Sequence, residues 1–154
     1  MNFKFLRFSS AILFLLLSKY CSAGDIVIKN NPTEKVVVFG NSKIKLTLDY
    51  NNKCNISGME VNGQTVISGS AGIFSSVRTA TNTYSSLKLI SDPVIKINQN
   101  TVTVSNIKYG NNEELVIENW KFNISETEIR LDIERNIPKA LIVEEAAFPS
   151  FNFR

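Results

Sequence analysis

The chain of 154 residues contains no histidine, so the commonest catalytic base and the commonest metal ligand are missing. Neither a Ser-His-Asp nor a Cys-His mechanism can be built from these residues, and a His-ligated metal site is excluded as well. The sequence also lacks a P-loop, a G-x-G-x-x-G motif and the spacing of an EF-hand loop. Asp25, Asp49 and Asp92 are far apart in sequence. We therefore expect no cofactor and no metal ion.

The chain also has little excess of either positive or negative charge. The chain has 17 Lys and Arg residues against 14 Asp and Glu residues, a formal net charge of +3. Three of the basic residues, Lys4, Arg7 and Lys19, lie in the N-terminal segment, and the rest of the chain carries 14 charges of each sign. A neutral body has no electrostatic footprint for nucleic acid or for an anionic membrane surface. We expect neither as a partner.

Residues 1–23 have the three parts of an export signal. Lys4 and Arg7 make the n-region positive, residues 11–17 are continuously apolar, and small residues precede a cleavage point after Ala23. The apolar run is shorter than the roughly 20 residues that a membrane-spanning helix needs. The sequence thus predicts a cleaved signal peptide and a secreted or periplasmic protein that begins at Gly24.

Two alternatives to cleavage after Ala23 stay open. One is an uncleaved anchor, and the other is a lipid attached to Cys21, which bulky Tyr20 just before it disfavours. Cleavage would leave Cys54 as the lone cysteine, unable to form an internal disulfide. We interpret Cys54 as a small, half-buried hydrophobic residue, with a reactive thiol or an intermolecular disulfide as alternatives.

The remainder, residues 24–154, predicts one all-β domain. Apolar and polar residues alternate as in half-buried strands, and turn signals recur about every 8–12 residues, as in a mostly antiparallel sandwich or barrel. Asn62-Gly63 is typical of a type I′ hairpin, residues 98–100 predict a three-residue hairpin loop, and residues 69–72 predict a turn. The strands expected cover residues 44–50, 56–61, 65–67, 73–79, 86–90, 94–97, 101–109, 120–124, 129–133 and 140–143.

The last residues are unusually aromatic for a chain end. Phe148, Phe151 and Phe153 lie close to Arg154, whereas free termini are usually polar and frayed. We hypothesise that the domain is truncated here, as part of a longer protein, or that it meets a partner chain through these residues. The alternative is a terminal strand that packs on its own sandwich.

Pairs of carboxylates are candidates for acid–base chemistry, since glycoside hydrolysis needs two of them. Each pair in this chain also has a simpler interpretation as solvated surface or loop, and we predict no catalytic residue. Either Glu144 or Glu145 could still be buried or directed to a site. The pairs are Asp132 with Glu134, Glu144 with Glu145, and Glu113 with Glu114.

Aromatic residues offer a different function, because exposed rings can stack on sugars. Tyr84 lies in the polar segment 81–86, which favours exposure. Trp120 alternates with Phe122 and Ile124, a pattern more typical of core. Tyr84 and Trp120 are the two candidate ligand-binding residues, and carbohydrate is the candidate ligand. Tyr109 is a weaker candidate.

The order of these segments supports a resemblance. Residues 44–50, 56–64, 72–77, 84–86 and 120–135, with 144–149, resemble the N-terminal β-supersandwich domain of secreted bacterial glycoside hydrolases. The resemblance implies a non-catalytic domain that precedes an (α/α)-barrel carrying the catalytic carboxylates, and no catalytic residue transfers to this chain. Two alternatives remain: a stand-alone secreted carbohydrate-binding or adhesion module, and a structural β domain of the cell envelope.

Overall fold

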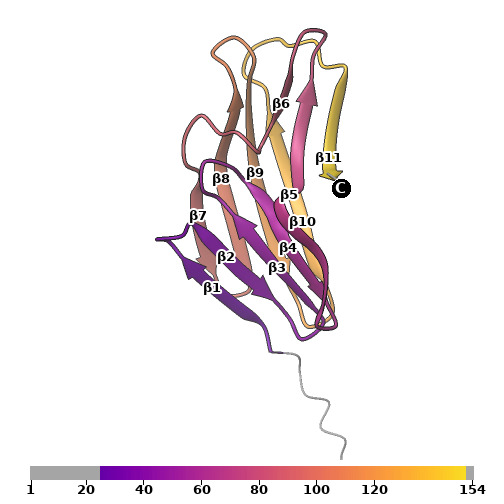
Figure 1. The fold of residues 1–154 in the computed structure, drawn as a ribbon. Helices are drawn as coiled ribbons and strands as arrows, with labels where there is room; N and C mark the ends of the chain where they lie inside the picture. Colours follow the sequence, from indigo (N-terminus) through magenta and orange to yellow (C-terminus); the bar gives the residue numbers. More distant parts are fainter. Residues whose placement is uncertain (1–24, 152–154) are drawn as a thin grey trace, which may run out of the picture.

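A computed structural model describes residues 25–151, in which every regular element is a β-strand. Eleven strands form two antiparallel sheets that face each other (Figure 1). The sequence-based prediction of an all-β, mostly antiparallel sandwich is confirmed. The predicted signal peptide and Phe153 lie outside the described residues, and only the backbone of Phe151 is described.

The larger sheet has seven strands and the smaller has four. The larger runs in the order β1 (Val27–Asn31), β2 (Val36–Gly40), β3 (Ile44–Asp49), β4 (Asn55–Val61), β5 (Gln64–Arg78) and β11 (Glu145–Phe151), with β6 (Thr83–Ser85) also paired to β5. The smaller runs in the order β10 (Ile129–Asn136), β9 (Leu115–Ile124), β8 (Thr101–Gly110) and β7 (Val94–Asn98).

The core lies between the sheets and follows the alternation of the strands. Along β9 every second side chain, from Val116 to Ile124, is buried, because neighbouring residues of a strand point to opposite faces. Phe122 of β9 meets Phe39 of β2 with ring centroids 4.8 Å apart, which joins the two sheets. Burying an apolar side chain of this size stabilises the fold by about 1.5–3 kcal/mol.

Two hairpins test the predicted turns. Asn62 and Gly63 have φ values of 51° and 77°, so the type I′ signal is confirmed. The hairpin between β7 and β8 differs from the expectation, because Asn98 pairs directly with Thr101. Its loop therefore contains two residues rather than three.

Strand β5 replaces two predicted strands and the predicted turn at residues 69–72. The chain stays extended from Gln64 to Arg78, and the extra residues form a bulge opposite Ser57. Asn55, fully buried, donates its Nδ2 to the carbonyls of Ser70 at 3.1 Å and Ala71 at 2.7 Å. The bulge thus lets one strand pair with β4 in its first half and with β6 and β11 in its second.

The other differences concern strand positions. Residues 86–90 are not a strand, since the strand in this region is β6, and residues 140–143 are irregular because the last strand begins at Glu145. Strands β1 and β2 were not predicted. Tyr84 consequently lies on a short strand rather than in a loop. These shifts decide which side chains meet at the end of the sandwich.

Candidate functional site

Three polar side chains gather around Tyr84 at one end of the sandwich. The Tyr84 hydroxyl donates a hydrogen bond to Glu114 Oε2. Asn82 Nδ2 donates to the same carboxylate oxygen at 2.9 Å, and Asn111 Nδ2 donates to the Tyr84 hydroxyl oxygen at 2.7 Å. We call Tyr84, Glu114, Asn82 and Asn111 the Tyr84 cluster. It brings together a ring, a carboxylate and two amides.

Local structure explains how these side chains meet. Tyr84 pairs with Val77, which is fully buried, so the Tyr84 side chain lies on the same, inward face of the larger sheet. The loop between β8 and β9 turns towards it. There Asn111 Oδ1 accepts hydrogen bonds from the backbone N–H groups of Glu113 and Glu114, both at 2.8 Å. This turn places the Glu114 carboxylate against Tyr84.

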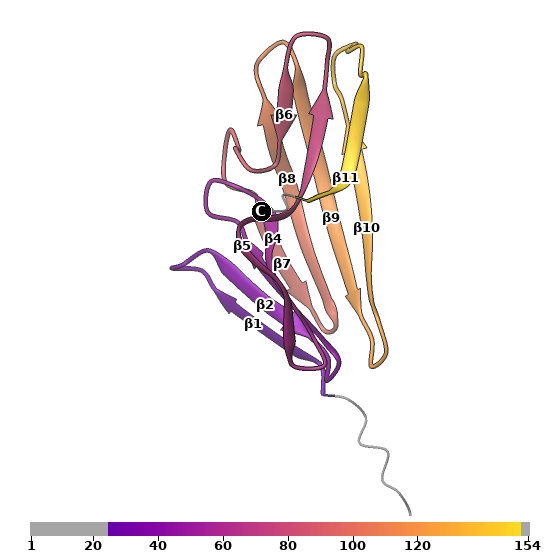
Figure 2. The same cartoon turned by 45° about the vertical axis from the view of Figure 1, so that its right-hand side comes forward.

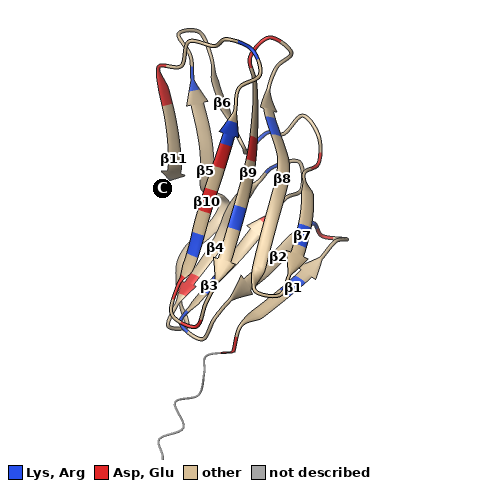
Figure 3. Cartoon of the chain, turned by 180° about the vertical axis from the view of Figure 1, so that it is seen from behind, with Lys and Arg blue, Asp and Glu red and all other residues tan. Residues whose placement is uncertain are grey.

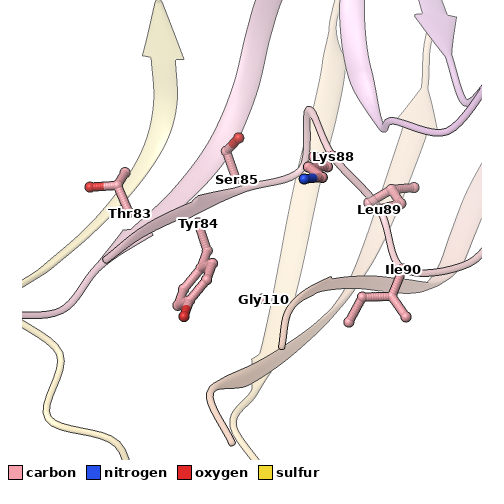
Figure 4. A pocket seen from close by; sticks show the side chains of 7 residues that line it. All are labelled: Thr83, Tyr84, Ser85, Lys88, Leu89, Ile90 and Gly110. Atoms are coloured by element: carbon pink, nitrogen blue, oxygen red, sulfur yellow. The ribbon is translucent and has the colours of Figure 1, made fainter. Parts of the chain in front are cut away.

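Two hollows lie next to the Tyr84–Glu114 pair. One, of about 480 Å³, is lined by residues 83–85 and 88–90 and by Gly110. Figure 4 shows the Tyr84 ring projecting from β6 near Gly110, with Leu89 and Ile90 on the adjoining loop. The other, of about 380 Å³, is lined by residues 79–81 and 140–142 and by Glu113 and Glu114. Each hollow therefore has one member of the pair in its wall.

Apolar side chains accompany the polar ones at these hollows. Ile90, in the wall of the first, is 54% exposed, and Ile142, in the wall of the second, is 85% exposed. Large apolar side chains that stay exposed beside convergent polar groups are typical of binding sites. This end of the sandwich therefore has both components of a ligand site.

The hydrogen bonds within the cluster fix its charge state. The bond to Glu114 raises the pKa of Tyr84 from its ordinary 10.0, because ionising the hydroxyl would remove the donated proton. Hydrogen bonds from Tyr84 first, and then from Asn82, lower the pKa of Glu114 from its ordinary 4.5. At neutral pH the site presents a carboxylate held by neutral donors.

A second polar group is buried between the sheets and centres on Glu118, which is fully buried. Its Oε1 accepts from Ser75 Oγ at 2.7 Å, from the Tyr109 hydroxyl at 2.9 Å and from Arg135 Nε at 2.6 Å. Its Oε2 accepts from Trp120 Nε1 at 2.8 Å. Arg135 Nη2 also donates to Ser75 Oγ at 2.8 Å. Donors from both sheets thus hold one carboxylate.

The groups of this Glu118 network keep their protonation states at neutral pH. Burial, with the nearby Glu118 charge, raises the pKa of Tyr109. For Arg135, burial acts to lower the pKa, but the hydrogen bond and charge of Glu118 outweigh it, so the pKa is raised. Both donors therefore remain protonated at neutral pH. With both carboxylate oxygens occupied, the network ties the two sheets together and leaves no group free for acid–base chemistry.

Of the two candidate ligand-binding residues, only Tyr84 has exposed surface. Trp120 is fully buried, and Phe148 of β11 packs against its indole with ring centroids 5.3 Å apart. No face of the indole is therefore open to a ligand in this structure, which agrees with the core interpretation. Tyr109 is fully buried as well. The structure does not bring Trp120 into the Tyr84 cluster.

Cys54 is more deeply buried than expected. Its side chain is fully buried rather than half-buried, and burial raises the pKa of its thiol well above the ordinary value. The neutral thiol is a poor nucleophile. Cys54 thus packs as a small core residue.

The predicted carboxylate pairs separate into surface and site residues. Asp132 forms an exposed ion pair with Arg130 at 3.0 Å, and both Glu144 and Glu145 are exposed and paired with Arg78. Glu114 lies in a loop and keeps part of its surface exposed, as expected, but Tyr84 and Asn82 also bond to its carboxylate. Glu118 was missed. Its only signal in the sequence was a carboxylate at an inward position between Val116 and Trp120.

Within residues 25–151, no group of three or more Cys, Asp or Glu side chains is placed to hold a metal ion. The same residues contain no helix that is both long and apolar enough to cross a membrane. Comparisons of the chain with protein-family models, curated proteins and solved structures found no match. The geometry of the Tyr84 cluster is therefore the main observation from which a function can be argued.

Proposed function

We propose that this chain is a non-catalytic carbohydrate-binding β-sandwich, which serves as the N-terminal domain of a secreted carbohydrate-active enzyme. The observation that carries this proposal is the Tyr84 cluster, in which Tyr84 lines the hollow of about 480 Å³ and Glu114 lines the hollow of about 380 Å³. Carboxylate and amide groups suit sugar hydroxyls, because they accept or donate in a plane. An aromatic ring next to them adds an apolar face on which a sugar ring can stack.

The size and charge of the site favour a short neutral saccharide. A hollow of about 480 Å³ lies within the usual range of small-ligand sites, roughly 300–1,000 Å³. Glu114, in the wall of the adjacent hollow of about 380 Å³, is held by two neutral donors and can accept further bonds from hydroxyl groups. Lys88, in the wall of the hollow of about 480 Å³, adds a further donor.

Two features support a binding role rather than hydrolysis. Glycoside hydrolysis uses two carboxyl groups that flank one bond. In the hollow beside Glu114, the second carboxylate is Glu113, which is 83% exposed and paired with Lys139 at 3.3 Å. The buried Glu118 has both oxygens occupied by protein donors. These arrangements fit a domain that holds a sugar for chemistry performed elsewhere.

The test is a titration of the purified chain with neutral mono-, di- and trisaccharides of glucose, galactose and N-acetylglucosamine. Nuclear magnetic resonance should show shifts in the side-chain amides of Asn82 and Asn111, and calorimetry should give the affinity. Tyr84→Phe, which removes only the hydroxyl, and Glu114→Gln should each weaken binding about tenfold or more, by loss of one to two hydrogen bonds.

Glu113→Gln is the matched control, because it changes the neighbouring carboxylate and leaves the cluster intact. It should bind like the original chain. If no saccharide shifts the two amides, or if Glu113→Gln and Glu114→Gln weaken binding equally, the proposed site is wrong.

A further inference from the structure

The free edge of β10 differs from the other sheet edges of this protein. Edge strands expose unpaired N–H and C=O groups, and proteins protect them with short strands, bulges, proline or charged side chains, of which β10 has only the last. Strands β1 and β7 have five residues each, and β11 carries a bulge and Pro149. Strand β10 has eight residues, no proline and an uninterrupted register with β9. Figure 2 shows it at the flank of the sandwich, and no described strand pairs with its outer edge.

The inward side chains of β10 are incompletely covered. Ile129, Leu131 and Ile133 face the interior but are only partly buried. Leu131 and Ile133 line an open groove of about 350 Å³ with Arg135, Ala146 and Phe148, between the edge strands of the two sheets. An additional strand beside β10 would cover these apolar groups and pair its free backbone.

The charges on the outward face of β10 favour a second copy of β10 as the additional strand. Figure 3 shows charges of both signs along this strand. Arg130 comes first, followed by Asp132 and Glu134 on the same face. If a second β10 lies antiparallel about a two-fold axis through Asp132, each Arg130 faces the partner subunit's Glu134. The same register places Leu131 opposite the partner subunit's Ile133, on the apolar face.

We propose that the chain forms a symmetric dimer in which the β10 strands of two copies pair antiparallel. The pairing joins two four-stranded sheets into one and matches opposite charges on the outer face twice. It overlaps most of β10, which gives the longest backbone ladder that this edge permits. The pair of Asp132 carboxylates at the axis is unfavourable, and the same register places Ile129 opposite the partner subunit's Arg135.

Sedimentation velocity of the purified full chain over a wide range of concentration tests the proposal, and should show a monomer–dimer equilibrium. Arg130→Glu should weaken the dimer about tenfold or more, because two attractive pairs become repulsive. The double variant Arg130→Glu/Glu134→Arg should restore it, which also shows that the single variant still folds. Asp132→Asn should tighten it, because the repulsion at the axis is lost.

The control is the exchange Lys45→Glu/Glu60→Lys, an exposed ion pair between β3 and β4, away from the sheet edges. It should leave the dimer unchanged. A chain that stays monomeric at every concentration overturns the proposal. So does a dimer that is indifferent to Arg130→Glu, or one that the double variant does not restore, since either result assigns the contact to another surface or partner.

Discussion

Arg135 lies directly opposite Glu118 on the neighbouring strand, and its Nε donates to the Glu118 carboxylate at 2.6 Å. The Glu118 side chain is fully buried, whereas 22% of the Arg135 side chain is exposed. Ser75 of the larger sheet bonds to both of them. Through Ser75, this ion pair therefore links the edge strand β10 of the smaller sheet to strand β5 of the larger sheet.

Removing the cation from this pair should be costly. Arg135→Met keeps most of the apolar stem but leaves Glu118 buried without its counter-charge. Breaking a buried pair in this way costs about 3–5 kcal/mol. Urea unfolding followed by circular dichroism should show the loss as a lower midpoint with little change in slope.

Arg130→Met supplies the comparison on the same strand. Arg130 is 70% exposed and pairs with Asp132 on the surface, so its loss should cost less than about 1 kcal/mol. Combining Arg135→Met with Glu118→Leu should cost less than the sum of the two single changes, because no unpaired charge then remains. Equal costs for Arg135→Met and Arg130→Met would contradict a structural role for the buried pair.

Phe148 covers the only tryptophan of the chain, Trp120. Phe148→Ala should expose the indole, shift its fluorescence to longer wavelength and make it accessible to acrylamide. Because Phe148 is half-buried, we expect a stability loss of about 2 kcal/mol, below that of a fully buried phenylalanine. Phe74→Ala is the control, since Phe74 lies between two buried residues of β5 and faces outward. It should leave the emission of Trp120 unchanged.

Gly72 occupies the bulge of β5 with a φ of 55°, and an added Cβ would lie 2.0 Å from the carbonyl oxygen of Ile56. Gly72→Ala must displace that backbone, so we expect it to cost more than about 2 kcal/mol. Gly63→Ala has the same backbone strain at a φ of 77° but meets no atom within 4 Å, and should cost only about 1 kcal/mol. Thermal unfolding distinguishes them. Equal losses would show that the close approach to Ile56 is unimportant.

The sequence predicted the fold best where strands alternate, as in β3, β9 and β10. It failed at β2, where Val36, Val37, Val38 and Phe39 are all apolar and show no period of two. The glycines at residues 69 and 72 were interpreted as a turn, because a bulge uses the same positive φ values without ending the strand. Whether such a segment turns or bulges depends on Asn55, which is distant in sequence and holds its carbonyls.

The site was predictable only in part. The polar neighbours of Tyr84 indicated exposure, but its bond to Glu114 joins residues 30 positions apart and depends on how β6 meets the β8–β9 loop. Glu118 was unpredictable for a related reason. A carboxylate is normally solvated, and the donors that allow its burial come from strands far from β9 in the chain, such as Ser75.

The pairing of Tyr84 with Glu114 predicts a measurable effect of pH. Because Glu114 has a lowered pKa in the folded chain, its bonds stabilise the fold fully above its ordinary value of 4.5. That contribution is lost as the pH falls through the lowered value. Tyr84→Phe removes the largest cause of the shift, so the pKa of Glu114 should rise towards 4.5. Carbon-detected magnetic resonance of the Glu114 carboxyl follows this titration directly.

At alkaline pH, the contribution of the Tyr84 hydrogen bond to stability changes with pH in the opposite direction. The pKa of Tyr84 is raised from 10.0, so its bond contributes below that value and is lost as the pH rises through the raised one. Tyr109→Phe is the matched control, because its hydroxyl belongs to the buried Glu118 network and does not touch Glu114. It should leave the Glu114 titration unchanged. If Tyr84→Phe also leaves that titration unchanged, the carboxylate is held by other donors and the cluster does not act as one unit.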